Sequence, residues 1–519
     1  MGAAIAANHA GLALPSLRWF YSLAPDSQIA GGNPDWLVEL ANGLGYTPAT
    51  VVGDAVCGFL ALVGILLTIF GGRFHFSPLT LQKFKRFRSI GRGYASFRIL
   101  MFLMLLAMLD QALVGKRALA VHYEGKWHFP AFEQKLYSEE DFGGSGQAEA
   151  NYREMKERFA GDDRGNRVIL PPVPWEPTFD TDYSQNRPVE ERGGVYYSKG
   201  ADEPYSGLAY SFYADDPGKR FRKLVFRRGR LSGRCETYMK SGEIAAVEEW
   251  KDGEMVSGKT VAGADSAELE KVEATPLTQI LYPPVAPSFE HRHFFGTDSK
   301  GWDIVAQLFG GLQIIFKASL IYLAVTYALG LTIGCLMGYF GGAFDITVQR
   351  FVEILANVPF LYVVMIIADR IGRENITLIN ILLVMCLLRW IGITYYMRTA
   401  TYREKERDYV AAARVLGAGP GRVIFRHILP NALSTVVTLI PFSMSTITTS
   451  LTALDFLGFG LPEKYPSWGR VLSDGVANMG SPWIVASVFA MMVMVLLVVT
   501  FIGEAVREAY DPKQFTTYK

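Results

Sequence analysis

The stretch from Trp483 to Ile502 reads WIVASVFAMMVMVLLVVTFI, which is twenty residues without a charged side chain. An α-helix of about 20 apolar residues is long enough to cross a hydrocarbon core about 30 Å thick. Six further apolar stretches of similar length occur upstream, at Asp54–Gly71, Tyr94–Val114, Ala318–Met337, Phe351–Ala368, Ile376–Met397 and Ala432–Leu454. One such stretch alone fits a buried core helix, but seven in one chain predict an all-α polytopic membrane protein.

The composition of the chain agrees with this class. Charged residues make up 19% of the 519 residues, below the roughly 25% of an average soluble domain, and the hydrophobic fraction is 50%. Four cysteines in a chain of this length are too few for a disulfide scaffold. These values exclude disordered, collagen-like and disulfide-stapled proteins.

Basic residues in the connecting segments predict the orientation of the spans. Gly71–Arg98 contains seven Lys or Arg residues and no acidic residue, and Arg398–Arg426 contains seven basic residues against three acidic ones. Because positively charged loops stay on the cytoplasmic side, both segments and the C-terminus should be cytoplasmic. The long polar stretch Gly115–Ser299 should then lie on the outer, periplasmic side.

The same pattern divides the chain into four regions. Residues 1–71 form an N-terminal extension with an additional span, and residues 72–114 contain the cytoplasmic basic segment and the first core span. Residues 115–299 form the periplasmic domain. Residues 300–519 form a core with five spans.

Within the outer region, residues 184–275 are predicted to form a small β insertion. The segments Phe226–Gly233 (FRRGRLSG) and Trp250–Gly258 (WKDGEMVSG) each place two polar residues and a glycine after an aromatic residue. This order is typical of a strand that is followed by a tight turn, and its repetition suggests stacked hairpins. The units resemble MORN-type β-hairpin repeats, and an unrelated small β domain fits the short match equally well.

The most informative polar segment is Asp408–Asn431, which reads DYVAAARVLGAGPGRVIFRHILPN. Its Ala-rich start predicts a short helix that ends at Gly417, followed by a second short amphipathic segment over Val423–Ile428. Pro430 should begin the next span. Two short helices around a glycine break make a compact knob beneath the membrane, where alanine side chains let another surface approach closely. The alternative is an ordinary loop between spans.

The pattern AAxxxG, which begins at Ala412 and ends at Gly417, resembles the EAA loop of ABC importer permeases, as does the Leu429–Pro430 pair twelve residues later. In that family, the loop (residues 398–430 here) docks into a groove on a cytoplasmic ATPase. The chain departs from the family pattern at Ala411, where glutamate is usual, and at His427, where isoleucine is usual. The resemblance implies that the ATPase-coupling residues are Tyr409, Val410, Ala411, Ala412, Ala413, Gly417, Leu429 and Pro430.

Further segments agree with the same family: HFFGTDSKGWD at His293–Asp303, GYFGG at Gly338–Gly342 with Asp345 after it, LDFLGFGLP at Leu454–Pro462, and GEAVR at Gly503–Arg507. The pattern is similar to that of the second permease subunit of oligopeptide and dipeptide importers, and particularly to the Yej-type branch for microcin C and oligopeptides. The resemblance implies six core transmembrane helices of the type I importer permease, in a bacterial inner membrane.

The resemblance also implies partners. They are a second permease subunit, cytoplasmic ATP-binding subunits, a periplasmic peptide-binding protein and the lipid bilayer. No nucleic acid is expected as a partner. We expect ATP hydrolysis in a separate partner chain, so that this chain is a transport subunit and not an enzyme, with no cofactor and no metal site.

Two charged residues fall inside predicted spans, where each is costly unless it is paired or hydrated. Glu353 lies near the inner end of its span, and Arg389 lies deeper. A functional interpretation places both in a translocation path, together with Pro441 and Ser443 of the sixth predicted span. A structural ion pair between spans is the simpler interpretation of both charges.

Two other functions fit parts of the pattern. A membrane-anchored receptor or scaffold would use the outer β repeats to bind a partner and the spans only as an anchor. A proton-coupled carrier would need several carboxylates at mid-membrane depth, and the spans offer few. The substrate itself stays open, because peptides, modified peptides and nickel complexes share this type of permease.

Overall fold

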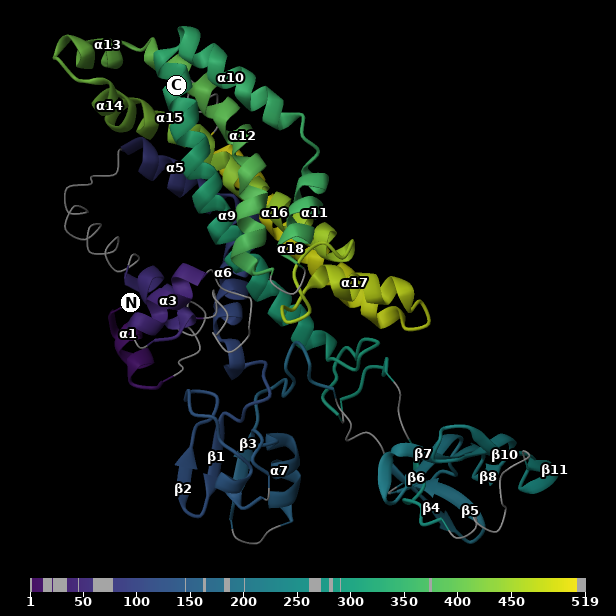
Figure 1. The fold of residues 1–519 in the computed structure, drawn as a ribbon. Helices are drawn as coiled ribbons and strands as arrows, with labels where there is room; N and C mark the ends of the chain where they lie inside the picture. Colours follow the sequence, from purple (N-terminus) through teal and green to yellow (C-terminus); the bar gives the residue numbers. More distant parts are fainter. Residues whose placement is uncertain are drawn as a thin grey trace. The chain divides into compact units, whose positions relative to one another are not determined.

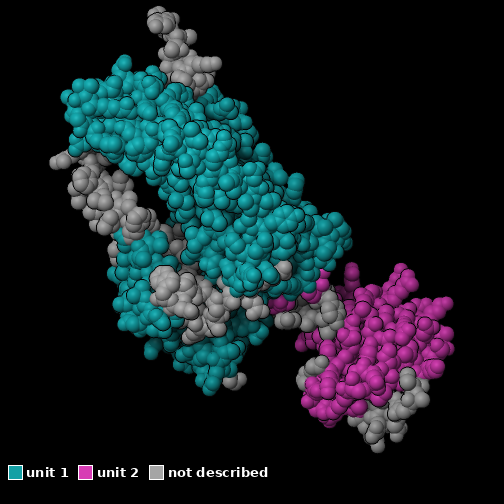
Figure 2. Space-filling view, turned by 45° about the horizontal axis from the view of Figure 1, so that its top comes forward, with its two compact units in different colours: residues 1–180, 286–519 teal, residues 181–285 magenta. Residues whose placement is uncertain are grey.

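The computed structural model describes residues 2–12, 21, 35–44, 46–58, 78–144, 146–161, 165–181, 187–199, 201–260, 272–279, 283–289, 291–372 and 376–510. The chain forms two compact units, coloured teal and magenta in Figure 2. Unit 1 comprises residues 1–180 and 286–519 and contains the long helices. Unit 2 comprises residues 181–285 and is built from β-strands.

In the described part of unit 1, five helical segments are long and apolar enough to cross a membrane (Figure 1). Each of the five segments overlaps one of the predicted stretches. This confirms the helical, multi-span class. The segments are α6 (Gly91–Met108), α9 (Ile304–Phe340), α12 (Leu378–Lys405), Val437–Phe456 with α16 (Ile440–Phe456), and α18 (Pro482–Tyr510).

The described part of the N-terminal region includes the shorter helices α1 (Gly2–His9), α3 (Asp35–Leu44) and α5 (Pro78–Ser89). The additional span predicted over Asp54–Gly71 lies mainly outside the described residues, which end at residue 58 in this part of the chain and resume at residue 78. This span therefore stays a prediction.

The predicted span Phe351–Ala368 is not one straight helix. It is divided between α10 (Gly342–Ala356) and α11 (Phe360–Ile371), which meet at an angle of 73°. Pro359 precedes α11 directly, and proline has no backbone N–H and clashes with the preceding turn of a helix. The pair is apolar enough to count as a sixth, broken span.

Close contact between α9 and α12 depends on glycines spaced four residues apart. Gly330, Gly334 and Gly338 are all buried on one side of α9. A Cβ atom at Gly334 would lie 2.6 Å from the backbone oxygen of Thr394, and one at Gly338 would lie 2.6 Å from Cβ of Thr401. Small residues at this spacing let two membrane helices approach each other closely, and here they allow α9 and α12 to pack together.

The segment His293–Asp303 leads directly into α9. Asp303 is the N-cap of this helix, and its carboxylate accepts a hydrogen bond of 2.7 Å from the backbone N–H of Ala306. Its other oxygen lies 2.8 Å from Nδ1 of His293, and both side chains are completely buried. The ring of Trp175 stacks on His293 with 4.2 Å between the ring centres. The residues that resemble the permease family therefore have a structural role in anchoring this helix.

Residues 115–180 form a small α/β layer within unit 1. Strand β1 (Ala120–Tyr123) pairs with β2 (Lys126–His128) and β3 (Arg167–Ile169) in an antiparallel sheet. Helix α7 (Tyr152–Ala160) begins at Asn151, whose side chain accepts hydrogen bonds from two backbone N–H groups. Its buried aromatic side chains share a core with the sheet.

Unit 2 contains one nine-stranded antiparallel sheet, which is larger than the small insertion that the sequence suggested. The strand order is β11-β10-β9-β7-β6-β12-β4-β5, and β8 pairs with β7. The strands are β4 (Arg187–Arg192), β5 (Val195–Ser198), β6 (Gly207–Tyr213), β7 (Asp216–Arg227), β8 (Arg230–Leu231), β9 (Gly233–Tyr238), β10 (Ile244–Lys251), β11 (Glu254–Thr260) and β12 (Thr278–Gln279).

Both predicted strand–turn units are β-hairpins. Arg228 and Gly229 connect β7 to β8 with φ angles of 48° and 74°, and Asp252 and Gly253 connect β10 to β11 with φ angles of 49° and 92°. Two consecutive residues with positive φ form the type of tight turn that matches the twist of a hairpin. Such hairpins occur in many β proteins, so the resemblance to MORN repeats stays a prediction.

One segment of unit 2 matches the letters of a phosphate-binding loop but not its structure. Gly253–Thr260 reads GEMVSGKT, which fits the pattern Gly-x4-Gly-Lys-Thr. In a true phosphate loop, these residues wrap around the phosphates and lead into a helix. Here they form the turn before β11 and the strand itself, which pairs with β10. This strand has no loop to surround a phosphate, so the segment offers no ATP site.

Candidate functional site

The coupling segment consists of two short helical pieces around a left-handed glycine. Helix α13 (Asp408–Val415) ends where Gly417 adopts a φ of 80°, and α14 (Pro420–Arg422) continues into the π-helical turn η4 (Val423–Ile428). The N–H of Ala418 donates to the carbonyl of Ala413 at 3.0 Å, which closes the end of α13. The predicted glycine break and the two-piece shape are therefore present.

One side of this segment packs against the rest of the chain. Val410, Val423 and Ile428 are completely buried, and they form a small core with Tyr339 near the end of α9. Ala413 is 7% exposed and lies one helical turn after Val410. Ala413 therefore faces inward. The predicted contact of this residue with an ATPase stays a prediction.

The outward side of the segment is apolar at its tip. Val415 and Leu416 are 88% and 87% exposed, and Ala411 and Ala412 are also exposed. The sequence interpretation overlooked this pair. Helical periodicity could have found Val415, which lies about 140° around the helix from Val410. It could not have found Leu416, which follows the last residue of α13.

The remaining predicted coupling residues lie at the base of the segment. Tyr409 is partly buried, and its hydroxyl donates a 2.7 Å hydrogen bond to Glu404 at the end of α12. Burial and this hydrogen bond raise the pKa of Tyr409 to about 12. Leu429 packs against the core at the start of α15 (Leu429–Val436), and Pro430 beside it is exposed. These contacts join the coupling segment to the membrane helices.

A buried ion pair holds the start of α10 against α12. Asp345 is 3% exposed, and its two carboxylate oxygens accept hydrogen bonds of 2.6 and 2.5 Å from the guanidinium of Arg398. The hydroxyl of Tyr402 donates a third hydrogen bond of 2.7 Å to the same carboxylate. The sequence marked Asp345 only as part of a family pattern, whereas the structure shows its partners.

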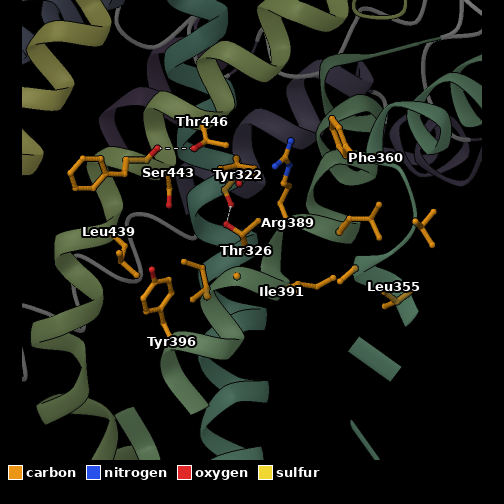
Figure 3. A pocket seen from close by; sticks show the side chains of 16 residues that line it. Tyr322, Thr326, Leu355, Phe360, Arg389, Ile391, Tyr396, Leu439, Ser443 and Thr446 are labelled. Carbon is orange, nitrogen blue, oxygen red and sulfur yellow. Dashed lines mark hydrogen bonds between the residues drawn. The ribbon is translucent and has the colours of Figure 1, made fainter. Parts of the chain in front are cut away.

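A cavity of about 420 Å³ opens among α9, α12, α16 and the junction of α10 with α11 (Figure 3). Of the four residues predicted for a translocation path, Arg389 and Ser443 line it. Pro441 is buried in α16 and is not part of the lining. Glu353 also lies outside the lining. It pairs at 2.6 Å with Arg350, three residues earlier in the same helix, and this is not the predicted ion pair between spans.

Arg389 does not form the ion pair between spans that the simpler interpretation of its charge predicted, as far as the described residues show. Its guanidinium carbon lies 4.4 Å from the ring centre of Phe360, and Nη2 donates to the hydroxyl of Ser450 at 3.3 Å. Within the ranges that the structure covers, no carboxylate pairs with Arg389, and no cluster of three His, Cys, Asp or Glu side chains is suited to a metal ion. The candidate site therefore consists of an exposed apolar tip at Val415 and Leu416 and a cavity among the long helices that contains the guanidinium of Arg389.

Comparison with known proteins agrees with this arrangement. Residues 330–516 match the family model of the binding-protein-dependent transport system inner membrane component. The chain is 28% identical over 441 residues to the peptidoglycan transport system permease protein YejE of Agrobacterium fabrum, covering 85% of this chain and 94% of the relative. It is 27% identical to the inner membrane ABC transporter permease protein YejE of Escherichia coli, covering 84% of this chain and 98% of the relative.

A shorter alignment has higher identity. The oligopeptide transport system permease protein OppC of Haemophilus influenzae is 34% identical over 229 residues, which is 44% of this chain and 73% of OppC. These matches favour a transport subunit over the receptor and carrier alternatives. The chain belongs to the binding-protein-dependent inner membrane components, the multi-pass permease subunits of ABC importers, and as such it is a transport subunit and not an enzyme.

Proposed function

We propose that this permease moves peptides or peptide-like compounds across the inner membrane. The observation that carries the proposal is the length of the match to the two YejE proteins, which extends over 94% and 98% of their sequences. The match is therefore much longer than the permease core at residues 330–516, and it must include a large part of the outer region. The identity to an oligopeptide permease over the core supports the same substrate class.

Uptake of labelled peptides tests this function. In a host without other oligopeptide importers, removal of this chain should abolish uptake of a radiolabelled tetrapeptide, and the plasmid-borne chain should restore it. Uptake of a free amino acid serves as the control and should not change. Peptide uptake at the original rate in the strain that lacks the chain would contradict the proposed substrate class.

We further infer an arrangement in which a second permease subunit completes the pathway and ATP-binding subunits dock on the coupling segment. The exposed side chains of Ala412, Val415 and Leu416 form the contact, and Gly417 shapes the end of the helix that presents them. Val410 and Ala413 act indirectly by holding α13 in place. A periplasmic binding protein delivers the substrate, and the pathway opens and closes through a rigid-body change of the two permeases.

The proposed topology places residues 115–299 in the periplasm and the C-terminus in the cytoplasm, because of the basic segments at 71–98 and 398–426. Cysteine labelling tests it with little background, since all four native cysteines are buried. In cells with a permeabilised outer membrane, a membrane-impermeant thiol reagent should label Ser206→Cys and leave Ser89→Cys unlabelled. Both serines are exposed, so access to the side chain does not differ. The reverse labelling pattern would contradict the topology.

A further inference from the structure

Arg389 lies near the middle of a membrane span. It is eleven residues after Leu378, the first residue of α12, which places it about 16 Å along the helix axis. The hydrocarbon core of a bilayer is about 30 Å thick. A charged side chain at this depth must be paired or must face water, and it usually marks a functional path.

The contacts of Arg389 leave its charge without a counter-ion. The neutral hydroxyl of Ser450 accepts one of its five N–H donors, and the face of Phe360 covers the guanidinium carbon. Other arginines of the same core are used differently, since Arg398 pairs with Asp345 and Arg350 pairs with Glu353. Arg389 therefore differs from these arginines in having only neutral contacts.

The cavity around Arg389 is suited to a small ligand with one negative group. Figure 3 shows the guanidinium within the cavity lining, near Phe360 and Tyr322. No acidic side chain contributes to the lining, and Arg389 is the one basic residue in it, as far as the described ranges extend. The hydroxyl of Tyr396, a side chain that is 58% exposed, is available for hydrogen bonds to a ligand backbone. A guanidinium binds a carboxylate through two parallel N–H···O bonds, which favours this anion over a neutral amide.

We propose that Arg389 binds the C-terminal carboxylate of a peptide that passes through this cavity. The inference rests on the proposed function, because it assigns a position to one group that all linear peptides share. Recognition of the terminus does not depend on the side chains, since the carboxylate is independent of the peptide sequence. The competing occupant is a carboxylate of the second permease subunit, which would make Arg389 a structural residue.

Equilibrium binding to the purified transporter complex, without its binding protein, tests the proposal. The probes are a radiolabelled tripeptide with a free C-terminus and the same tripeptide as a C-terminal amide. The wild-type complex should bind the free acid about tenfold more tightly than the amide, as expected for a charge-assisted hydrogen bond. Arg389→Gln should remove this preference by weakening binding of the acid alone, and Arg389→Lys should keep part of it.

Arg350→Gln is the matched control, because this arginine lies outside the cavity lining and its side chain is 73% exposed. It should leave both affinities unchanged. Equal affinities for acid and amide in the wild-type complex would overturn the proposal. So would an equal loss of both peptides in Arg389→Gln, particularly together with loss of the second permease during purification, because that result indicates pairing between subunits. If the wild-type complex neither binds nor transports either peptide, the proposed peptide function fails, and this inference fails with it.

Discussion

Replacing Leu416 with aspartate should abolish ATP-driven uptake while the permease stays in the membrane at its normal level. The Leu416 side chain is 87% exposed at the end of α13, so its replacement removes little packing within the chain. If this side chain enters an apolar groove on the ATPase, docking would bury an unpaired carboxylate. A cost of about 3 kcal/mol, which is within the range for an unpaired polar group, corresponds to a loss of about 100-fold in affinity.

Co-purification of the ATPase and uptake in membrane vesicles measure this effect. Leu416→Met is the control and should keep both, because it preserves the size and apolarity of the side chain. Ala413→Glu should behave differently from Leu416→Asp. Ala413 is buried, so a glutamate there should lower the amount of folded permease as well as ATPase binding. Normal uptake by Leu416→Asp would show that the exposed tip is not the docking surface.

Replacing Arg398 with alanine should strongly reduce the amount of folded permease. Without Arg398, the Asp345 carboxylate stays buried with only the Tyr402 hydroxyl as a partner. Removal of one partner of a buried ion pair costs about 3–5 kcal/mol, which is a large part of the stability of a typical protein. The thermal stability of the detergent-solubilised protein and its level in the membrane should both fall.

The double variant Asp345→Asn/Arg398→Ala should recover much of the stability, because no buried charge remains and asparagine still accepts the hydrogen bond from Tyr402. Arg350→Ala is the matched control. It breaks an ion pair whose Arg350 and Glu353 side chains are 73% and 34% exposed, so the cost should stay below about 1 kcal/mol. Equal stability of Arg398→Ala and Arg350→Ala would contradict the assigned role of the buried pair.

Local features of the fold could be predicted from the sequence because they depend on neighbouring residues. The apolar run Trp483–Ile502 lies within α18, since about 20 uncharged residues define a span without reference to the rest of the chain. Gly417 ends α13 in the left-handed conformation, which favours glycine because glycine has no Cβ atom. The hairpin turns at Arg228–Gly229 and Asp252–Gly253 follow from equally local geometry.

The broken span illustrates how a local signal can be lost. Pro359 is visible in the sequence, but the hydropathy of Phe351–Ala368 alone predicts one continuous helix. The letters of Gly253–Thr260 match the pattern of a phosphate loop, although strand pairing gives this segment another structure. In the broken span and in this strand, backbone hydrogen bonding decides the conformation. The composition of the side chains alone does not predict that conformation.

Which side chains of the candidate site face outward was decided only by the tertiary structure. Val410 is buried because it packs with Val423, Ile428 and Tyr339, and Tyr339 lies at the end of a distant helix. Ala413 is buried one turn after Val410, whereas Leu416 is exposed. Arg389 was recognisable as a charge within a span, but its neutral contacts with Phe360 and Ser450 come from α11 and α16. Hydropathy and turn conformation are properties of adjacent residues, whereas burial and ion pairing depend on residues that only folding brings together.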